Sequence, residues 1–197
     1  MSFLSEDELK AIGFRHVGKN VCISNKAVFY NAENISIGDH SRIDDFCLFS
    51  AGSGGIIIGR YVHIGCYSSL IGTGKIVMED FSGLSGRVSV YSSNEDLSGK
   101  SLSNPSAPPQ FRNYTFGDVI IRKHAVVGCG SVVLSNVEIG TGAIIGALSL
   151  VKENCADFSI YSGVPARKIS YRLQNVLELE KQVWANCESP GSEKSDR

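Results

Sequence analysis

The sequence has no run of about 18 consecutive apolar residues, so it predicts no membrane-spanning helix. Its first ten residues, MSFLSEDELK, are acidic and lack a long apolar stretch, which excludes a signal peptide of the usual form. The 19 Lys and Arg residues are balanced by 20 Asp and Glu residues. This balance leaves no excess of positive charge that would favour nucleic acid as a partner. We therefore expect a cytoplasmic protein with neither a membrane nor a nucleic acid as its partner.

The sequence also lacks paired cysteines. None of the six cysteines forms a CxxC pair, which argues against a zinc knuckle or a thioredoxin-like redox site. Without an export signal, we expect free thiols in a reducing compartment, where cysteine serves as a small hydrophobic side chain. These residues are Cys22, Cys47, Cys66, Cys129, Cys155 and Cys187.

Glycine is abundant, with 21 residues in 197, about 11% against a typical usage of roughly 7%. It accompanies a six-residue repeat, which is clearest in IIRKHAVVGCGSVVLSNVEIGTGAIIGALSLV. Large aliphatic residues in this stretch recur every six positions, at Ile121, Val127, Val133, Ile139, Ile145 and Val151. Four residues after each of the first five stands a small or β-branched residue, namely Ala125, Ser131, Val137, Ala143 and Ser149.

The period of six identifies the fold class. An α-helix would spread positions six apart around its circumference, and a hairpin meander would alternate with a period of two. A triangular coil with three six-residue faces instead places the aliphatic residue inside and a small residue near each corner. The same phase is visible over most of residues 17–151. The sequence therefore predicts an all-β protein, a parallel β-helix of hexapeptide repeats.

Two segments interrupt or follow the repeat. Residues 91–118 contain three of the five prolines and no repeat, so we expect a long loop inserted into the β-helix. Residues 170–187 have the apolar spacing of one amphipathic helix. The predicted organisation is an N-terminal helical cap at 1–16, the β-helix at 17–169, the helix at 170–187 and a disordered tail at 188–197.

The repeat, together with the words IIGALSLV and YSGVPARKI near its end, resembles the hexapeptide-repeat acyltransferases over roughly residues 17–172. The loop words YSSNEDLSG and SNPSAPPQF further resemble the bacterial branch that N-acylates nucleotide-linked amino sugars. The resemblance implies a left-handed β-helix, a homotrimer with active sites between subunits, and an acyl-coenzyme A donor along the outer wall of the C-terminal coils. It implies an amino sugar linked to dTDP or UDP as the acceptor.

The expected base is unusual. Many relatives carry a histidine in the protruding loop, but this chain has no histidine between His63 and His124. Asn94, Glu95 and Asp96 stand there instead. An amine with a pKa of about 8 already has a sizeable neutral fraction at neutral pH, so a carboxylate suffices to orient it and take its proton. We therefore predict Glu95 and Asp96 as catalytic residues. The alternative is a solvated turn in which Asp96 binds local backbone.

The binding residues follow from the motifs. For the sugar nucleotide the candidates are Ser92, Asn94, Arg87, Arg112 and His63. The last of these is also the alternative base. For coenzyme A, the resemblance implies that backbone amides at a glycine-alanine corner meet the thioester and that basic residues meet the phosphates. These candidates are Gly128, Gly146, Ala147, Lys152, Arg167 and Lys168.

Three other functions are alternatives for this fold. An O-acetyltransferase that acts on a galactoside or polysaccharide hydroxyl uses the same fold. A non-catalytic β-helix scaffold would not need the GALS and GVPAR motifs. Some hexapeptide-coil proteins bind zinc through a close histidine pair and a third histidine, as in the γ-class carbonic anhydrases. No two histidines here lie within 16 residues of each other, so no metal is expected.

Overall fold

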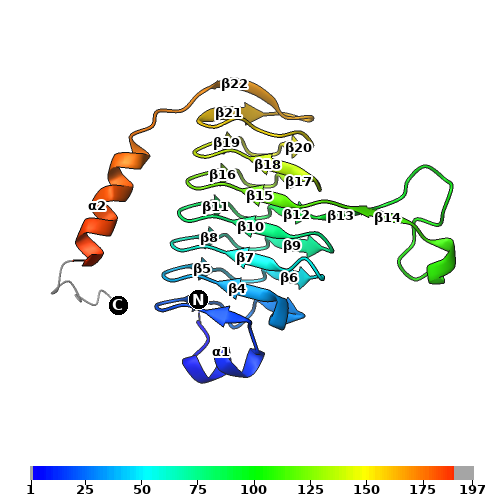
Figure 1. Ribbon diagram of the computed structural model, residues 1–197, viewed down its shortest axis with the longest axis horizontal. Helices are drawn as coiled ribbons and strands as arrows, with labels where there is room; N and C mark the ends of the chain where they lie inside the picture. Colours follow the sequence, from blue (N-terminus) through cyan, green and yellow to red (C-terminus); the bar gives the residue numbers. More distant parts are fainter. Residues whose placement is uncertain (1, 189–197) are drawn as a thin grey trace.

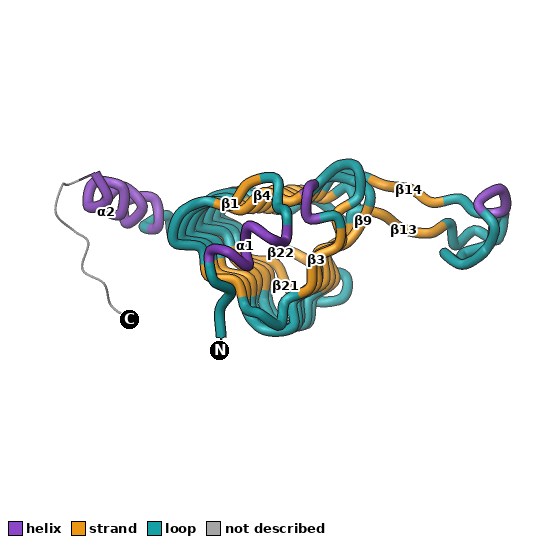
Figure 2. The backbone as a smooth tube through the Cα atoms, turned by 90° about the horizontal axis from the view of Figure 1, so that it is seen from below, coloured by secondary structure: helices purple, strands orange, loops and turns teal. Residues whose placement is uncertain are grey.

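The computed structural model, described for residues 2–188, is a stack of parallel coils with a helix at one end, a second helix beside the stack and a protruding arm (Figure 1). Viewed from its end, the stack is triangular, with the arm and the second helix leaving it in opposite directions (Figure 2). Each coil contributes one short strand to each of three parallel sheets, which we call the first, second and third faces. The predicted parallel β-helix is confirmed.

The strands of each face follow the order of the coils. The first face contains β1 (His16–Val17), β4 (Ile35–Ile37), β7 (Ile56–Ile58), β10 (Ile76–Met78), β15 (Val119–Ile121) and β18 (Val137–Ile139). The second contains β2 (Cys22–Ile23), β5 (Arg42–Ile43), β8 (His63–Ile64), β11 (Gly83–Leu84), β16 (Val126–Val127), β19 (Ile144–Ile145), β21 (Ser159–Ser162) and β22 (Arg167–Tyr171). The third contains β3 (Val28–Tyr30), β6 (Leu48–Ala51), β9 (Ser69–Gly72), β12 (Ser89–Tyr91), β17 (Val132–Val133) and β20 (Leu150–Val151).

The six-residue period arises because one residue per face points into the stack. All six aliphatic residues of the clearest repeat are at most 1% exposed, and the five small residues that follow them are buried as well. Parallel pairing keeps like residues above one another. Leu84, for example, pairs with Ile64 in the coil before it and with Val127 in the coil after it. Stacked coils therefore share one continuous hydrophobic core.

Most of the left-handed turn residues of the stack are not glycine. We call the corner between the first and second faces the first corner, the next the second corner, and the one between the third and first faces the third corner. Several turns there place a non-glycine residue in the left-handed region, for example His40 with a φ of 57° and Phe46 with a φ of 62°. Gly128 is needed for close approach instead, since a Cβ there would lie 2.5 Å from the backbone nitrogen of Ala147.

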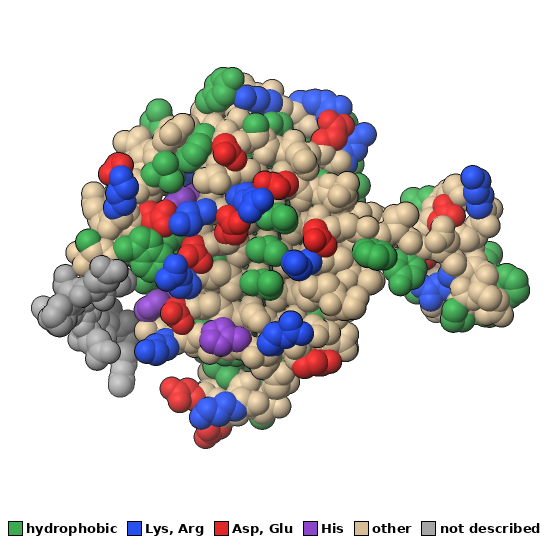
Figure 3. Space-filling model, in the orientation of Figure 1, with side chains coloured by type: hydrophobic (Ala, Val, Ile, Leu, Met, Phe, Trp, Pro, Cys, Tyr) green, Lys and Arg blue, Asp and Glu red, His purple; other side chains and the backbone are tan. Residues whose placement is uncertain are grey.

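The inserted segment at 91–118 is more ordered than a plain loop. It leaves the stack after β12, at the third corner, and returns to it at β15. Its base is a two-stranded antiparallel ladder of β13 (Ser93–Glu95) and β14 (Tyr114–Phe116), with a short 3-10 helix, η2 (Pro109–Phe111), near the tip. We call residues 93–116 the arm. In Figure 3 the arm stands off from the stack as a separate lobe.

Helices cover one end and one side of the stack. Helix α1 (Glu6–Ile12) begins at Ser5, which forms a capping box with Glu8, and it closes the N-terminal end. A second 3-10 helix, η1 (Ala32–Asn34), precedes β4. Helix α2 (Val176–Glu188) begins six residues later than the predicted position 170. The intervening backbone forms β22, which pairs antiparallel with β21 and so covers the edge of the last coil.

The described part of α2 runs back along the first corner (Figure 1). Trp184 packs edge-on against Tyr61 and Phe81, with ring centroids 5.5 and 5.3 Å away. Glu180 accepts hydrogen bonds from Lys123 at 2.7 Å and from the indole of Trp184 at 2.9 Å. Within residues 2–188, neither helix combines the length and apolar character needed to cross a membrane. The predicted tail, from residue 189 onward, lies outside the described residues.

Candidate active site

The predicted catalytic residues and the predicted thioester-binding residues occupy two different corners of the triangle. Glu95 and its neighbours belong to the arm, which leaves the third corner between β12 and β15. Gly146 and Ala147 lie at the second corner, between β19 and β20. The full width of the third face separates these corners, so one copy of the chain does not bring the two groups together.

The base of the arm contains an ion pair that the sequence did not reveal. Arg112 Nη2 lies 3.1 Å from Glu95 Oε1, and both side chains are mostly buried. The other carboxylate oxygen, Glu95 Oε2, is buried and has no hydrogen-bond partner among the described residues. Asn94 Nδ2 donates to Ser135 Oγ at 2.6 Å and ties the arm to the coil above. The arm therefore holds Glu95 in place with one acceptor atom unused.

Asp96 has a different environment from Glu95. Its carboxylate accepts hydrogen bonds from the backbone N–H of Ser98 at 2.8 Å and from Ser101 Oγ at 2.7 Å. Hydrogen bonds from Ser98 are the main cause that lowers the pKa of Asp96, with Ser101 adding to them. This is the local turn weighed as the alternative for Asp96.

Ser92 does not face solvent. It is 0% exposed, and its hydroxyl donates to the carbonyl of Gly74 at 2.7 Å. The role expected for it at a sugar hydroxyl thus has no support in the geometry. The small inward position near each corner requires a residue of this size, which explains why a serine stands there.

The second corner presents backbone amides to solvent. Cys129 and Ala147 occupy matching positions in successive coils, next to Gly128 and Gly146, and both are exposed. Their backbone N–H groups donate to no acceptor within residues 2–188, because the coil-to-coil bonds use the flanking amides of Gly128 and Leu148. Two unpaired N–H groups beside glycines can donate hydrogen bonds to an oxygen that develops negative charge.

The basic candidates lie at the C-terminal end of the stack. Arg167 in β22 contacts Glu153 at 3.5 Å, and both side chains are more than half exposed. Lys168 Nζ lies 3.6 Å from the centroid of the Tyr171 ring. Lys152 is exposed just beyond β20. Lys152 thus lies at the third corner, whereas Arg167 and Lys168 lie in the last strand of the second face.

His63 lies outward on β8 and has a partner that sequence reasoning missed. Its Nε2 lies 2.9 Å from Oδ2 of Asp44, and Asp44 also accepts a 2.7 Å hydrogen bond from Arg42 Nε. Burial alone would raise the pKa of Asp44, but the hydrogen bonds from His63 and Arg42 lower it. The spacing of these residues in the sequence gives no signal, because residues 44 and 63 meet only when two coils stack.

Arg87 is exposed at the second corner. Its guanidinium carbon lies 5.0 Å from the centroid of the Tyr67 ring, so the side chain stacks on an aromatic face. Like His63, it lies on the side of the stack away from the arm of its own chain.

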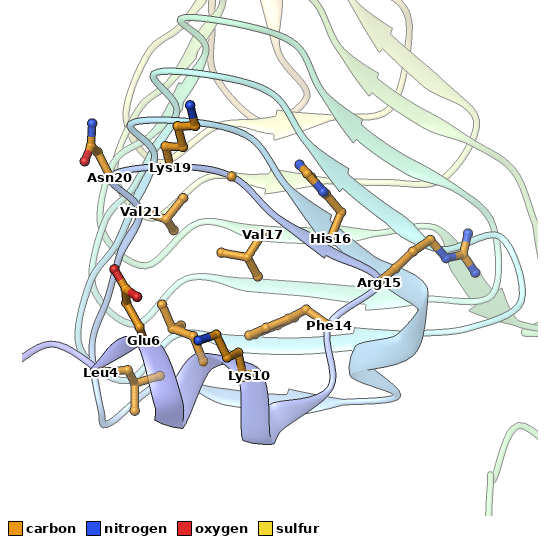
Figure 4. A pocket seen from close by; sticks show the side chains of 12 residues that line it. Leu4, Glu6, Lys10, Phe14, Arg15, His16, Val17, Lys19, Asn20 and Val21 are labelled. Atoms are coloured by element: carbon orange, nitrogen blue, oxygen red, sulfur yellow. The ribbon is translucent and has the colours of Figure 1, made fainter.

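A hollow lies elsewhere, at the N-terminal end of the stack. About 760 Å³ in volume, it lies between α1 and the first coil (Figure 4). Leu4, Phe14 and Val17 line it, with Lys10 at its edge. None of the predicted site residues contributes to it. No group of three or more metal-ligating side chains occurs within residues 2–188.

Comparison with known proteins agrees with this architecture. Residues 118–153 match the family described as bacterial transferase hexapeptide (six repeats). A dTDP-4-amino-4,6-dideoxy-D-glucose acyltransferase from Escherichia coli is 54% identical over 180 residues, which cover 91% of this chain and 94% of that protein. A dTDP-3-amino-3,6-dideoxy-alpha-D-galactopyranose 3-N-acetyltransferase from Aneurinibacillus thermoaerophilus is 33% identical over 76 residues, covering 37% of this chain and 40% of that protein.

Solved structures also match this chain over nearly its whole length. AntD, an N-acyltransferase from Bacillus cereus in complex with dTDP and 3-hydroxybutyryl-CoA, is 46% identical with a TM-score of 0.91, covering 95% of this chain and 99% of that chain. A serine-to-cysteine variant of AntD was solved with dTDP-4-amino-4,6-dideoxyglucose and coenzyme A, with a TM-score of 0.89, 46% identity, and coverage of 94% of this chain and 98% of that chain.

The fold and these similarities define an acyltransferase built on a hexapeptide-repeat β-helix. The chain belongs to the hexapeptide-repeat acyltransferases, as the sequence motifs predicted. Relatives that match over nearly its whole length include the acyltransferase of a dTDP-linked amino sugar and the N-acyltransferase AntD.

Proposed function

We propose that this protein transfers an acyl group from acyl-coenzyme A to the amino group of a dTDP-linked amino-deoxysugar. The observation that carries the proposal is the 54% identity to the dTDP-amino-sugar acyltransferase over 91% of the chain, a span that includes most or all of the arm. The complexes of AntD with dTDP, the amino sugar and coenzyme A agree with it. We place the reaction in the cytoplasm, within a pathway of surface-polysaccharide synthesis.

The site is completed by a second copy of the chain. The carboxylate of Glu95 and the free amides near Ala147 lie at different corners of one copy, separated by the third face. In a homotrimer with parallel stacks, the arm of one copy reaches the second corner of its neighbour. The exposed apolar side chains of the arm favour such burial, among them Leu97, Leu102, Phe111 and Phe116.

The chemistry then follows from the groups present. The amine nitrogen of the sugar attacks the thioester carbonyl carbon, and a carbon–nitrogen bond forms. Glu95 Oε2, the unused acceptor, takes the proton from nitrogen, while Arg112 holds the other oxygen. The carbonyl oxygen becomes negative and is stabilised by the backbone N–H groups of Cys129 and Ala147. The carbon–sulfur bond breaks, and the thiolate of coenzyme A leaves and takes up the proton.

Binding residues are proposed on the same basis. Lys152, Arg167 and Lys168 bind the phosphates of coenzyme A at the C-terminal end of the stack, where charge-assisted hydrogen bonds are strong. Asn94 orients the sugar beside Glu95. His63 faces the same neighbouring arm from the second face, where Asp44 fixes its ring.

A thiol-release assay with acetyl-CoA and dTDP-4-amino-4,6-dideoxyglucose tests the proposal. We expect Glu95→Gln to lower kcat by about 100-fold or more, because a general base contributes roughly that much. Asp96→Asn is the matched control, since its carboxylate already binds Ser98 and Ser101, and we expect it to lower kcat by less than tenfold.

Two results would contradict the proposal. Full activity of Glu95→Gln would remove the arm carboxylate from the chemistry. Thiol release with a galactoside, and none with the amino sugar, would indicate O-acetylation instead.

A further inference from the structure

A column of side chains runs up the second corner, one from each coil. Phe46 and Tyr67 stack with ring centroids 5.0 Å apart and an interplanar angle of 21°. Lys26 Nζ lies 5.3 Å below the Phe46 ring, and the Arg87 guanidinium covers Tyr67 at 5.0 Å. Each ring is about half exposed, so the column forms part of the surface.

The column is interrupted directly after Arg87. The next coil places Gly130 at the same position, with a φ of 70°, and the coil after it places Leu148 there, with a φ of 56°. Backbone hydrogen bonds fix this register, because the N–H of Gly130 donates to Gly86 and that of Leu148 to Cys129. One side chain is therefore missing between the guanidinium and the leucine.

The gap has the thickness of one aromatic ring. The column rises by 5.0 Å per coil where it is continuous, and parallel strands are spaced about 4.8 Å apart. Arg87 and Leu148 are two steps apart, so a ring between them would lie about 5 Å from each, a stacking distance. Leu148 now leans over the gap, with its Cδ2 2.8 Å from where a Cβ of Gly130 would be, and it is 73% exposed. Because most of this side chain faces solvent, a ring that enters the gap would displace it toward solvent and not into the core.

The first corner shows that a ring fits such a gap. There the column of His40, Tyr61, Phe81 and His124 is interrupted in the same way by Gly142, with a φ of 64°. The ring of Phe158, from the following coil, lies over that glycine. The chain thus fills one glycine gap with its own aromatic ring and covers the other with an exposed aliphatic side chain.

We propose that a nucleobase of the substrates inserts over Gly130, stacked between Arg87 and Leu148. The inference rests on the proposed function and extends it to a base-binding position. A nucleobase suits the gap because it is planar, and its π face is attracted by a guanidinium. Two sources carry one: the thymine of the dTDP-sugar and the adenine of coenzyme A.

Gly130→Phe tests the proposal by filling the gap from within. The backbone tolerates the change, since Phe46 and Phe81 adopt the same left-handed conformation at equivalent positions. Asn20→Phe is the matched control, because Asn20 has a φ of 54° at the start of the first-corner column, away from the gap. Calorimetric titration of each variant would use thymidine diphosphate and adenosine 3′,5′-bisphosphate, with melting temperature recorded for both.

We expect Gly130→Phe to raise the Kd of one of these nucleotides by about tenfold to hundredfold, the usual effect of losing one base stack. Asn20→Phe leaves both affinities unchanged. Weakening of thymidine diphosphate assigns the gap to the sugar nucleotide, and weakening of the adenosine bisphosphate assigns it to coenzyme A. Unchanged affinities in a folded Gly130→Phe protein overturn the proposal while the proposed function stands. A wild-type protein that binds neither nucleotide overturns both.

Discussion

Replacing Glu180 with glutamine tests how α2 is held against the coils. The Glu180 side chain is 10% exposed and meets Lys123 at 2.7 Å and His124 at 2.8 Å, while the indole of Trp184 also donates to it. Burial alone would raise the pKa of Glu180, but hydrogen bonds from Lys123, Trp184 and His124 lower it from 4.5 to about 2. The glutamine keeps the shape and an acceptor for Trp184 but loses the charge.

The magnitude and its pH dependence follow from linkage. A fall in pKa from 4.5 to about 2 corresponds to about 3 kcal/mol of stabilisation of the docked helix. Solvent screening of Lys123, which is 38% exposed, reduces this to about 1–2 kcal/mol. Since the pKa is lowered on docking, the stabilisation is complete above about pH 4.5. It declines as the pH falls and is lost near pH 2.

Trp184 makes the assay specific, because it is the only tryptophan in the chain. Acrylamide quenching of its fluorescence reports the exposure of α2 against the first corner. We expect Glu180→Gln to increase quenching at pH 7 and the difference from wild type to shrink below pH 4.5. Glu178→Gln is the control, since its side chain is 70% exposed and pairs with Lys181 within the helix. Equal quenching of wild type and Glu180→Gln from pH 7 to pH 3 would refute the reasoning.

Three further predictions concern the coils. Gly128→Ala should lower the free energy of unfolding by about 1–3 kcal/mol in a urea titration, because a Cβ there would collide with the next coil. The control is Gly83→Ala, where the nearest neighbouring atom lies 3.5 Å from the added Cβ. It should change the free energy of unfolding by less than half as much. Phe49→Ala should cost about 3–5 kcal/mol in the same titration, since the ring is fully buried. Exposed Cys129 should react with Ellman's reagent at pH 8 in the folded protein, while two thiols whose pKa burial raises to about 11 should react only after unfolding, namely Cys47 and Cys155. Unaltered stability of Gly128→Ala or Phe49→Ala, or rapid labelling of the buried thiols, would contradict the described packing.

The fold could be read from the sequence because each coil repeats one local rule. A buried aliphatic residue every six positions leaves a triangular coil as the simplest solution, and Val127 or Ile145 can be placed inside without coordinates. The β22 strand could not be placed in this way, because it forms by pairing with β21 at the open end of the stack. Its residues alone resemble the start of a helix.

Only part of the candidate site could be predicted from the sequence. The positions of Gly146 and Glu95 can be predicted from local sequence motifs. The partners that define their chemistry do not, since Arg112 lies 17 residues from Glu95 and meets it only through the antiparallel ladder of the arm. The interrupted column at Gly130 likewise becomes visible only when successive coils are stacked.

The most direct test of the proposed reaction is to identify the bond that holds the transferred acyl group. The purified protein would be incubated with carbonyl-labelled [¹³C]acetyl-CoA and dTDP-4-amino-4,6-dideoxyglucose, and the product examined by NMR. The account predicts a labelled amide on the sugar nitrogen, formed in step with free coenzyme A thiol. A labelled ester on a sugar hydroxyl, or thiol release without labelled sugar, would contradict it.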